Sequence, residues 1–308
     1  MQKITPSLWF DKNCEEAINF YISVFPNSKI THIQYYPEGS TEPHMQGMEG
    51  KVLTGIFELA GQRFMALDGG PIFKLNPSIS FILNFDPSKR ENAKEELTVL
   101  WKKLSEGGIA RMPLQKYDFS ELYGWTEDKY GVSWQLMLTD PSGEDRPFIT
   151  PSLMFTQERA GKAEEAVDFY LSVFKNSKKG MVARYPAGME HDKEGSIMFS
   201  DFMLENQWFA AMDSAQVHDF KFNEAVSLYV ECEDQNEIDE LWNKLTTAPE
   251  FEQCGWLKDK YGLSWQIIPK QLGELLSDPY KEKAGRVLQA MLQMKKIDIA
   301  GLQKAYDR

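Results

Sequence analysis

One twelve-residue motif occurs twice in the chain and constrains the fold more than any other feature. Residues 124–135 read Gly-Trp-Thr-Glu-Asp-Lys-Tyr-Gly-Val-Ser-Trp-Gln, and residues 255–266 read Gly-Trp-Leu-Lys-Asp-Lys-Tyr-Gly-Leu-Ser-Trp-Gln. Nine of the twelve positions are identical, which is too many for chance. The chain is therefore predicted to be a tandem duplication in which each copy is one structural unit.

Other segments repeat in the same order and at similar spacing, and they extend the duplication over most of the chain. A length of 308 residues suffices for about two domains. We therefore predict a first domain over residues 1–145, a second over 146–269 and a tail over 270–308. The repeated pairs are residues 4–10 with 149–155, 15–21 with 164–170, 62–68 with 207–213, and 76–80 with 223–227.

The pattern inside each copy predicts two modules, each with a strand, a helix and three further strands. In the first copy, residues 4–10 alternate in the manner of a strand. Residues 15–25 place apolar side chains at helical spacing, after two glutamates in the first turn. Strand-like segments follow, and the same order begins again at Ser78, so we expect four βαβββ modules in the chain. The following strand-like segments are 30–36, 53–59 and 63–67.

Loops and a tail complete the expected organisation. Residues 37–50 hold five glycines and prolines and are predicted to form a loop, and residues 140–147 are the linker. Asp128 to Gly131 is a turn in which Gly131 is free to take a positive φ. After Pro269, a pattern found once predicts helices whose apolar stripe either docks on a sheet or forms a dimer contact.

Composition argues against several kinds of partner. The net charge of −12 disfavours nucleic acid and anionic lipid, because both attract basic surfaces. No apolar run approaches the ~20 residues that span a bilayer, and the start lacks the apolar core of a signal peptide. Cys14, Cys232 and Cys254 form no CxxC pair and leave an odd thiol. We therefore expect a cytoplasmic protein with structural cysteines and no membrane or nucleic-acid partner.

These motifs carry a family resemblance. An opening strand followed by a Glu-Ala-x-x-Phe-Tyr helix, with a closing strand after Asp-Lys-Tyr-Gly, resembles the vicinal oxygen chelate superfamily of glyoxalase I, extradiol dioxygenases, and fosfomycin and bleomycin resistance proteins. The repeated twelve-residue motif is similar to the PhnB-like branch, often labelled 3-demethylubiquinone-9 3-methyltransferase. The resemblance covers residues 1–269. It implies an α+β fold in which four βαβββ modules form two glyoxalase-like curved mixed sheets, with modules pairing either within or between copies.

The methyl transfer in that label is not supported by the residues. A methyltransferase of the usual kind binds S-adenosylmethionine at a Gly-rich turn after the first strand of a doubly wound sheet. Here the first strand runs into Asp11-Lys12-Asn13-Cys14, which contains no glycine. We therefore expect no such cofactor.

In glyoxalase-like members, four side chains inside the cup, which is the concave side of the curved sheet, bind a divalent cation. Carried over by strand position, those places hold no imidazole, thiolate or carboxylate in either copy, so we expect no metal. Asp68 and Asp213 lie close to two of the places, and one of them could be the true position in each copy. The places are Thr5, Ala66, Ser80 and Gln135 in the first copy, and Thr150, Ala211, Ser227 and Gln266 in the second.

Alternation along the last strand of the first copy puts Gln135 opposite Trp134, so Gln135 faces the cup if Trp134 packs under the helices. Gln135 is then either a buried amide bonded to its neighbours or a group that orients a ligand. Trp9, Phe57 and Phe64 belong either to the core or to a ligand cavity. The predicted ligand-binding residues are Thr5, Ser7, Trp9, Ser80, Gln135, Thr150, Ser152, Ser227 and Gln266.

Three functions remain open on the sequence. In the first, each cup binds a small organic molecule without metal, as the bleomycin-resistance members do by sequestration. In the second, the protein is a lyase, isomerase or dioxygenase with substituted ligands or with a lid histidine, His44 or His191, as general base. The third is a structural role. A chain that holds both copies is expected to be a monomeric pseudo-dimer or a homodimer.

Overall fold

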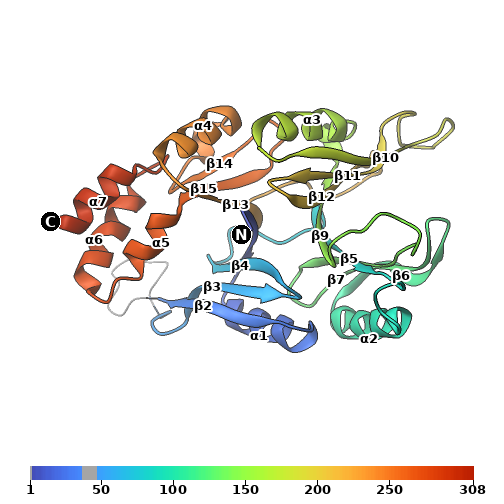
Figure 1. Cartoon of the computed structure of the whole chain (residues 1–308), viewed down its shortest axis with the longest axis horizontal. Helices are drawn as coiled ribbons and strands as arrows, with labels where there is room; N and C mark the ends of the chain where they lie inside the picture. Colours follow the sequence, from blue (N-terminus) through green and yellow to red (C-terminus); the bar gives the residue numbers. More distant parts are fainter. Residues whose placement is uncertain (1, 37–46) are drawn as a thin grey trace. The chain divides into compact units, whose positions relative to one another are not determined.

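The computed structural model describes residues 2–36 and 47–308, so the predicted loop at 37–50, with His44, lies largely outside the described residues. The strands form two mixed sheets (Figure 1). A seven-stranded sheet has the order β14-β15-β13-β1-β4-β3-β2, and an eight-stranded sheet has the order β10-β11-β12-β9-β5-β8-β7-β6. The predicted α+β class is confirmed. None of the described helices is long and apolar enough to cross a membrane.

The first copy contributes two complete βαβββ modules. The first module consists of β1 (Ile4–Phe10), α1 (Cys14–Val24), β2 (Lys29–Tyr35), β3 (Val52–Leu59) and β4 (Gln62–Asp68). The second consists of β5 (Ile79–Phe85), α2 (Ala93–Ser105), β6 (Ile109–Tyr117), β7 (Ser120–Glu127) and β8 (Ser133–Leu138). Gly131 in the turn before β8 has a φ of 92°, as the motif predicts.

The second copy departs from the prediction in its last module. Its first module is complete, but only two strands follow the helix of the next one. The chain between α4 and the repeated motif, residues 246–254, is half as long as residues 106–123 in the first copy, so no counterpart of β6 fits there. The complete module consists of β9 (Ile149–Phe155), α3 (Ala163–Val173), β10 (Lys178–Arg184), β11 (Ile197–Leu204) and β12 (Gln207–Asp213). The short one consists of β13 (Val226–Cys232), α4 (Gln235–Leu245), β14 (Trp256–Lys258) and β15 (Ser264–Pro269).

The eight-stranded sheet joins the two copies. Strands β5 to β8 come from the first copy and β9 to β12 from the second, and β5 pairs with β9 so that Ser80 lies opposite Ser152. The sequence left open whether modules pair within or between copies, and in this sheet they pair between copies. The domain limits predicted at 145 and 269 stay a prediction about the duplicated copies.

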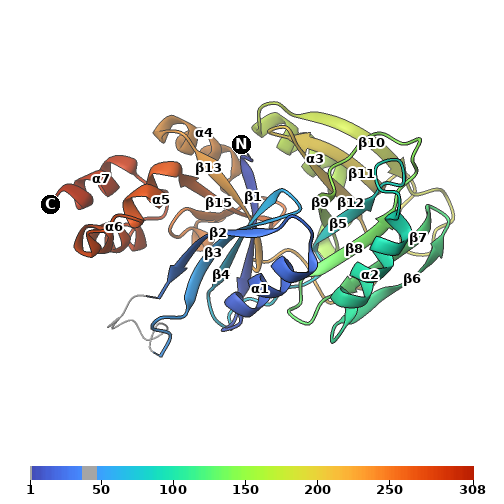
Figure 2. The ribbon, with the colours of Figure 1, turned by 60° about the horizontal axis from the view of Figure 1, so that its bottom comes forward.

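The chain forms two compact units, Pro6–Val226 and a smaller unit of Met1–Thr5 with Ser227–Arg308. In the larger unit, α2 lies against β5, β7 and β8, and α3 lies against β11 and β12 (Figure 2). A chain of aromatic contacts runs from Tyr21 of α1 through Phe57 and Phe64 to Phe81 and Trp134. Phe57 and Phe64 therefore belong to the core, as does Trp134, which is fully buried.

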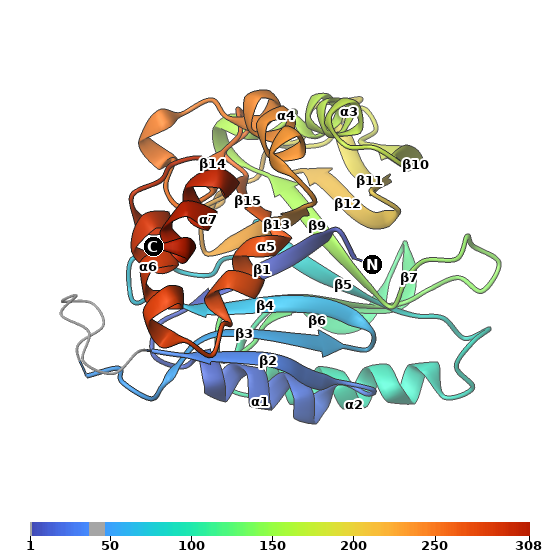
Figure 3. The ribbon, with the colours of Figure 1, turned by 60° about the vertical axis from the view of Figure 1, so that its left-hand side comes forward.

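In the smaller unit, the tail forms α5 (Lys270–Leu276), α6 (Lys281–Leu292) and α7 (Ile299–Asp307), which gather near the C-terminus in Figure 3. Their apolar residues Val287 and Leu302 form one buried cluster with Ile268 of β15, and Tyr229 of β13 packs against it. The apolar stripe of the tail thus docks on strands. Trp265 of the repeated motif is fully buried.

Candidate functional site

The predicted polar residues of the larger unit lie on one face of the eight-stranded sheet. A Cβ added to Gly124 would lie 2.5 Å from Trp101 of α2, so Gly124 faces the helices and its neighbours Tyr123 and Trp125 face the opposite way. Gln135 pairs with Trp125 in the ladder and shares that direction. We call the face that is turned away from α2 and α3 the open face; the name refers to this direction and not to solvent exposure, because the central residues of the face are buried.

Three buried polar side chains form the centre of the open face, and we call them the polar floor: Ser80, Gln135 and Ser152. Gln135 donates from Nε2 to Ser80 Oγ at 2.7 Å, and Tyr123 donates from its hydroxyl to Gln135 Oε1 at 2.7 Å. Ser152 lies directly opposite Ser80 on β9 and is 1% exposed. Its Oγ has no hydrogen-bond partner among the described residues. A buried hydroxyl without a partner carries a desolvation penalty that a bound ligand could remove.

An aromatic cluster adjoins the polar floor, and we call Tyr117, Phe119 and Tyr123 the aromatic wall. The Phe119 ring meets the edge of Tyr123 at 4.9 Å and stacks on Tyr117 at 5.7 Å. Phe119 is nevertheless 62% exposed, so it does not serve the core. Burial raises the pKa of the Tyr123 hydroxyl, which keeps its proton at neutral pH and remains a donor to Gln135.

A second polar group, which the sequence did not predict, lies around the loop after β12. Ser214 Oγ and His218 Nε2 are 2.7 Å apart, and the His218 ring lies 4.7 Å from that of Phe220. The Arg111 guanidinium lies over Phe220 at 5.8 Å and pairs through Nε with Glu127. Burial, helped by the charge of Arg111, lowers the pKa of His218. A histidine that is neutral at pH 7 can accept a proton.

Thr150, also predicted to bind ligand, has a partner within the protein. Its Oγ1 accepts a hydrogen bond from Asn84 Nδ2 at 3.2 Å, and Asn84 also donates to the carbonyl of Pro147. The linker is held further by Arg146, which bonds Asp201 at 2.6 Å and lies 3.8 Å above the ring of Trp208. This end of the sheet is therefore organised by the linker.

The smaller unit repeats part of the polar floor. Gln266 donates from Nε2 to Ser227 Oγ at 2.8 Å, as Gln135 does to Ser80. Ser264 Oγ, two residues before Gln266, has no partner among the described residues. Cys254 stands at the position that corresponds to Tyr123. Thr5 belongs to this unit and is buried.

Of the four places of the first copy, Ser80 and Gln135 lie in the eight-stranded sheet, whereas β1 and β4, which carry Thr5 and Ala66, belong to the seven-stranded sheet. Ser7 lies beside Met65 of β4 and is buried. Trp9 donates from Nε1 to the carbonyl of Gly70 at 2.7 Å, and its ring meets Phe73 at 5.0 Å. Within the eight-stranded sheet, the neighbour of Ser80 on the open face is Ser152 of the second copy.

The register of the strands contradicts the placement of Ala66 and Ala211 at ligand positions. Ala66 pairs with Leu8, and Ala211 pairs with Leu153, so both are out of phase with the polar positions of β1 and β9. The neighbouring residues Asp68 and Asp213 instead accept hydrogen bonds from backbone N–H groups near the starts of α1 and α3.

Asp213 accepts hydrogen bonds from the N–H groups of Gly161, Ala163 and Ile197, and Asp68 accepts one from Lys12. Burial raises the pKa of both carboxyls, and these backbone donors oppose the rise. Both aspartates are engaged in stabilising the fold.

The donors on the polar floor do not fit the divalent cation that the resemblance implies. The described residues contain no group of three or more His, Cys, Asp or Glu side chains that could hold a metal ion. Ser80, Ser152 and Gln135 are neutral, and Gln135 Oε1 is already occupied by the Tyr123 hydroxyl. Neutral hydroxyl and amide groups poorly replace the water lost by such an ion.

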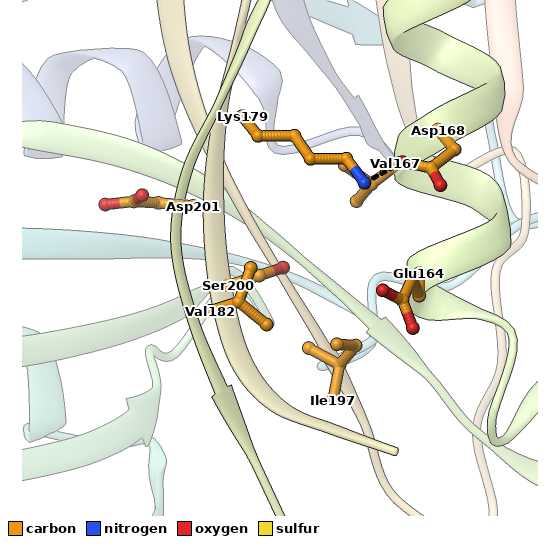
Figure 4. Close-up of a pocket in the computed structure, with 8 residues that line it drawn as sticks. All are labelled: Glu164, Val167, Asp168, Lys179, Val182, Ile197, Ser200 and Asp201. Atoms are coloured by element: carbon orange, nitrogen blue, oxygen red, sulfur yellow. Dashed lines mark ion pairs between the residues drawn. The ribbon is translucent and has the colours of Figure 1, made fainter. Parts of the chain in front are cut away.

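A small pocket lies on the opposite face of the same sheet, between α3 and the strands β10 and β11 (Figure 4). Val167 of α3 and Ser200 of β11 line it, and Lys179 pairs with Asp168 beside it. Asp201 points away from the other side chains in Figure 4, toward the open face. The pocket is therefore separate from the polar floor.

Comparison with known proteins finds the duplication again. The family model described as "3-demethylubiquinone-9 3-methyltransferase" matches residues 2–137 and 147–268. A solved Bacillus cereus structure, described as a putative 3-demethylubiquinone-9 3-methyltransferase, PhnB protein, is 40% identical over 45% of this chain and 100% of its own, with a TM-score of 0.40. A mutant of glyoxalase I from Zea mays is 10% identical over 86% of this chain and 90% of its own, with a TM-score of 0.48. No curated protein matches.

Proposed function

The chain belongs to the family whose model is described as 3-demethylubiquinone-9 3-methyltransferase, and we propose that it binds a small organic molecule on its open face without a catalytic metal. One observation carries this proposal. Ser152 Oγ is buried without a partner beside the bonded pair Ser80 and Gln135. Buried polar groups in proteins are nearly always satisfied, and each exception calls for a missing partner.

The composition of the open face supports an uncharged ligand. The polar floor carries no charged side chain, so an ion would lose its hydration there without a counter-charge. Beside it lie partly exposed aromatic residues, such as Phe119 and Trp125. Small-molecule sites typically combine apolar walls with a few fixed polar groups. The same reasoning extends the proposal to Ser227 and Gln266 of the smaller unit, with Thr5, Ser7, Trp9 and Thr150 as further candidate ligand-binding residues.

The methyl transfer in the family's name is not part of the proposal. Between β1 and α1 the chain has the residues Asp11 to Asn13, and these offer no glycine turn for a nucleotide-like cofactor. The sheets are mixed and are not doubly wound.

A second candidate function is an enzyme of the superfamily's lyase, isomerase or dioxygenase kind. The close pair of Ser214 and His218 favours it, since a neutral imidazole bonded to a hydroxyl is a common proton acceptor. His191, the lid candidate that falls within the described residues, is half-exposed beside Glu190 and has no comparable partner set.

We further propose that the two copies make the chain a pseudo-dimer that acts as a monomer or a homodimer. The free thiols fit a reducing compartment such as the cytoplasm. Burial raises the pKa of Cys14, and it raises that of Cys232 to about 12, so both remain unreactive thiols.

The test combines one substitution with metal removal. Changing Gln135 to Leu should weaken binding of any ligand found by thermal-shift screening by about 1–3 kcal/mol, because it leaves polar partners unpaired. Gln303→Leu, on the exposed side of α7, is the matched control and should bind normally. Chelated protein should bind as well as untreated protein. A tightly held, near-stoichiometric cation whose removal abolishes binding or activity would favour the metalloenzyme instead.

A further inference from the structure

Resting on that proposed function, we propose a class of ligand: a flat aromatic carbonyl compound. Its carbonyl oxygen accepts hydrogen bonds from the hydroxyls of Ser80 and Ser152, and its ring lies against the aromatic wall. Three features of the larger unit lead to this class: the direction of one hydrogen-bond chain, the position of one unpartnered hydroxyl, and the absence of charge on the polar floor.

The hydrogen-bond chain has a definite direction. The Tyr123 hydroxyl gives its single proton to Gln135 Oε1, so the Gln135 amide group turns its N–H toward Ser80 Oγ. Ser80 therefore accepts, and its own proton must go elsewhere. None of the described residues accepts that proton. The hydrogen-bond chain thus ends in a buried hydroxyl donor that has no acceptor in the described part of the protein.

Ser152 supplies a second donor beside the first. It lies directly opposite Ser80 in the antiparallel pair β5–β9, and both side chains are on the open face. Side chains at such positions are neighbours about 5 Å apart at Cβ. Both serines are almost fully buried, at 2% and 1% exposure. Two hydroxyl donors converge best on one oxygen with two lone pairs and no proton, which describes a carbonyl group.

The charges and hydrogen-bond donors of the site argue against three other classes of ligand: carboxylates, ammonium compounds and hydrocarbons. An ionised carboxylate would need a cation, and the guanidinium groups of Arg111 and Arg146 on the open face are already paired with Glu127 and Asp201. An ammonium group would bring further protons to a place that already has an excess of donors. A neutral hydrocarbon would leave both hydroxyls unsatisfied.

The aromatic wall determines the shape of the rest of the ligand. Tyr123 joins the two parts of the site, because its hydroxyl holds Gln135 while its ring contacts Phe119 and Tyr117 at 4.9 and 5.6 Å. Aromatic rings pair favourably in stacked and edge-on arrangements. A ligand with its carbonyl oxygen at Ser80 and Ser152 can therefore extend a flat ring toward this wall.

The experiment compares three probes of similar size on the full chain: acetophenone, ethylbenzene and benzoate. Acetophenone is expected to bind about tenfold or more tightly than the other two, since about 1.4 kcal/mol of hydrogen bonding gives that factor. Its infrared carbonyl stretch should shift to lower frequency when it is bound. Ser152→Ala removes no hydrogen bond made among residues 2–36 and 47–308, and it should reduce both the preference and the shift, as should Ser80→Ala.

Ser200→Ala is the matched control, because Ser200 lies on the same sheet but bonds the carbonyl of Ala211 on the helix side. It should leave the preference for acetophenone unchanged. Equal binding of ethylbenzene, tighter binding of benzoate, or an unshifted carbonyl stretch would overturn the carbonyl class while leaving small-molecule binding intact. If none of the probes binds at millimolar concentration and none perturbs the open-face resonances in NMR spectra, the proposed function itself is overturned.

Discussion

Replacing Asp128 with Asn should lower the free energy of unfolding by about 2–4 kcal/mol. This carboxylate of the repeated motif is 3% exposed and accepts four hydrogen bonds. Oδ1 accepts from the backbone N–H groups of Tyr130 and Val132 at 2.8 and 3.1 Å. Oδ2 accepts from Trp134 Nε1 and from the Tyr21 hydroxyl, both at 2.8 Å. The aspartate therefore joins the turn to α1 and to the largest core side chain.

The size of this loss in unfolding free energy depends on which hydrogen bonds of the carboxylate an asparagine amide can still make. Asn keeps one oxygen for the two backbone donors, but its NH₂ group faces the Trp134 N–H, which cannot reverse its role. Tyr21 can rotate its hydroxyl and accept instead. One buried donor is thus left unpaired, at about 1–3 kcal/mol, and the remaining bonds lose their charge assistance. Burial raises the pKa of Asp128, and the relief of that desolvation in Asn offsets part of the loss.

The assay is native-state hydrogen exchange at the amides of β8, because a chain with two compact units need not unfold in one step. Tyr21→Phe, which removes a single bond to the carboxylate, should cost about 1 kcal/mol. Asp259→Asn is the matched variant in the smaller unit, where the same three motif bonds recur. If β8 in Asp128→Asn exchanges as in the wild type, the carboxylate does not anchor the turn and the reasoning fails.

Two further predictions concern buried and half-buried rings. Trp134→Ala and Trp265→Ala should each cost about 3–5 kcal/mol, the range for a large aromatic that leaves a cavity, and unchanged urea midpoints would contradict their place in the core. The pKa of His218 is lowered from 6.5 by burial and by Arg111, so its contribution to stability is full above pH 6.5 and is lost as the pH falls through the folded-state pKa. Melting temperatures at pH 7.5 and pH 5.0 should therefore differ less in His218→Phe than in the wild type.

Much of the local structure could be predicted from the sequence because the signals are local. Alternation placed Gln135 and Trp134 on opposite faces of a strand, and both are found there. The short last module was not predicted, because the repeat led us to expect a strand where residues 246–254 are too few to form one.

It was harder to predict which strands and residues of one copy lie beside those of the other copy. The modules of both copies present equivalent strands, so periodicity alone cannot choose between pairing within and between copies. The neighbour of Ser80 is Ser152, which lies 72 positions further along the chain. Asp68 and Asp213 could have been ligands by sequence, and only the helix starts that they hold show their role.

The residues that distinguish the open face were missed for a related reason. A search for doubled motifs finds what the two copies share, and Tyr123 is not shared, since Cys254 takes its place. His218 lies in a segment that is two residues longer in the second copy, between Asp213 and Ser227, than between Asp68 and Ser80. The sequence differences between the two copies could therefore have pointed to Tyr123 and His218.

Because of the duplication, a substitution in one copy can affect a site that the other copy also builds. The polar floor takes Ser80 and Gln135 from the first copy and Ser152 from the second, so a substitution in either copy alters the same face. Tyr123 fixes the orientation of the Gln135 amide by donating to its oxygen, whereas a thiol at Cys254 is a much weaker donor. The two glutamines of the repeated motif therefore differ in how firmly their amide groups are oriented. If orientation selects the ligand, the doubled motif does not imply two equivalent sites.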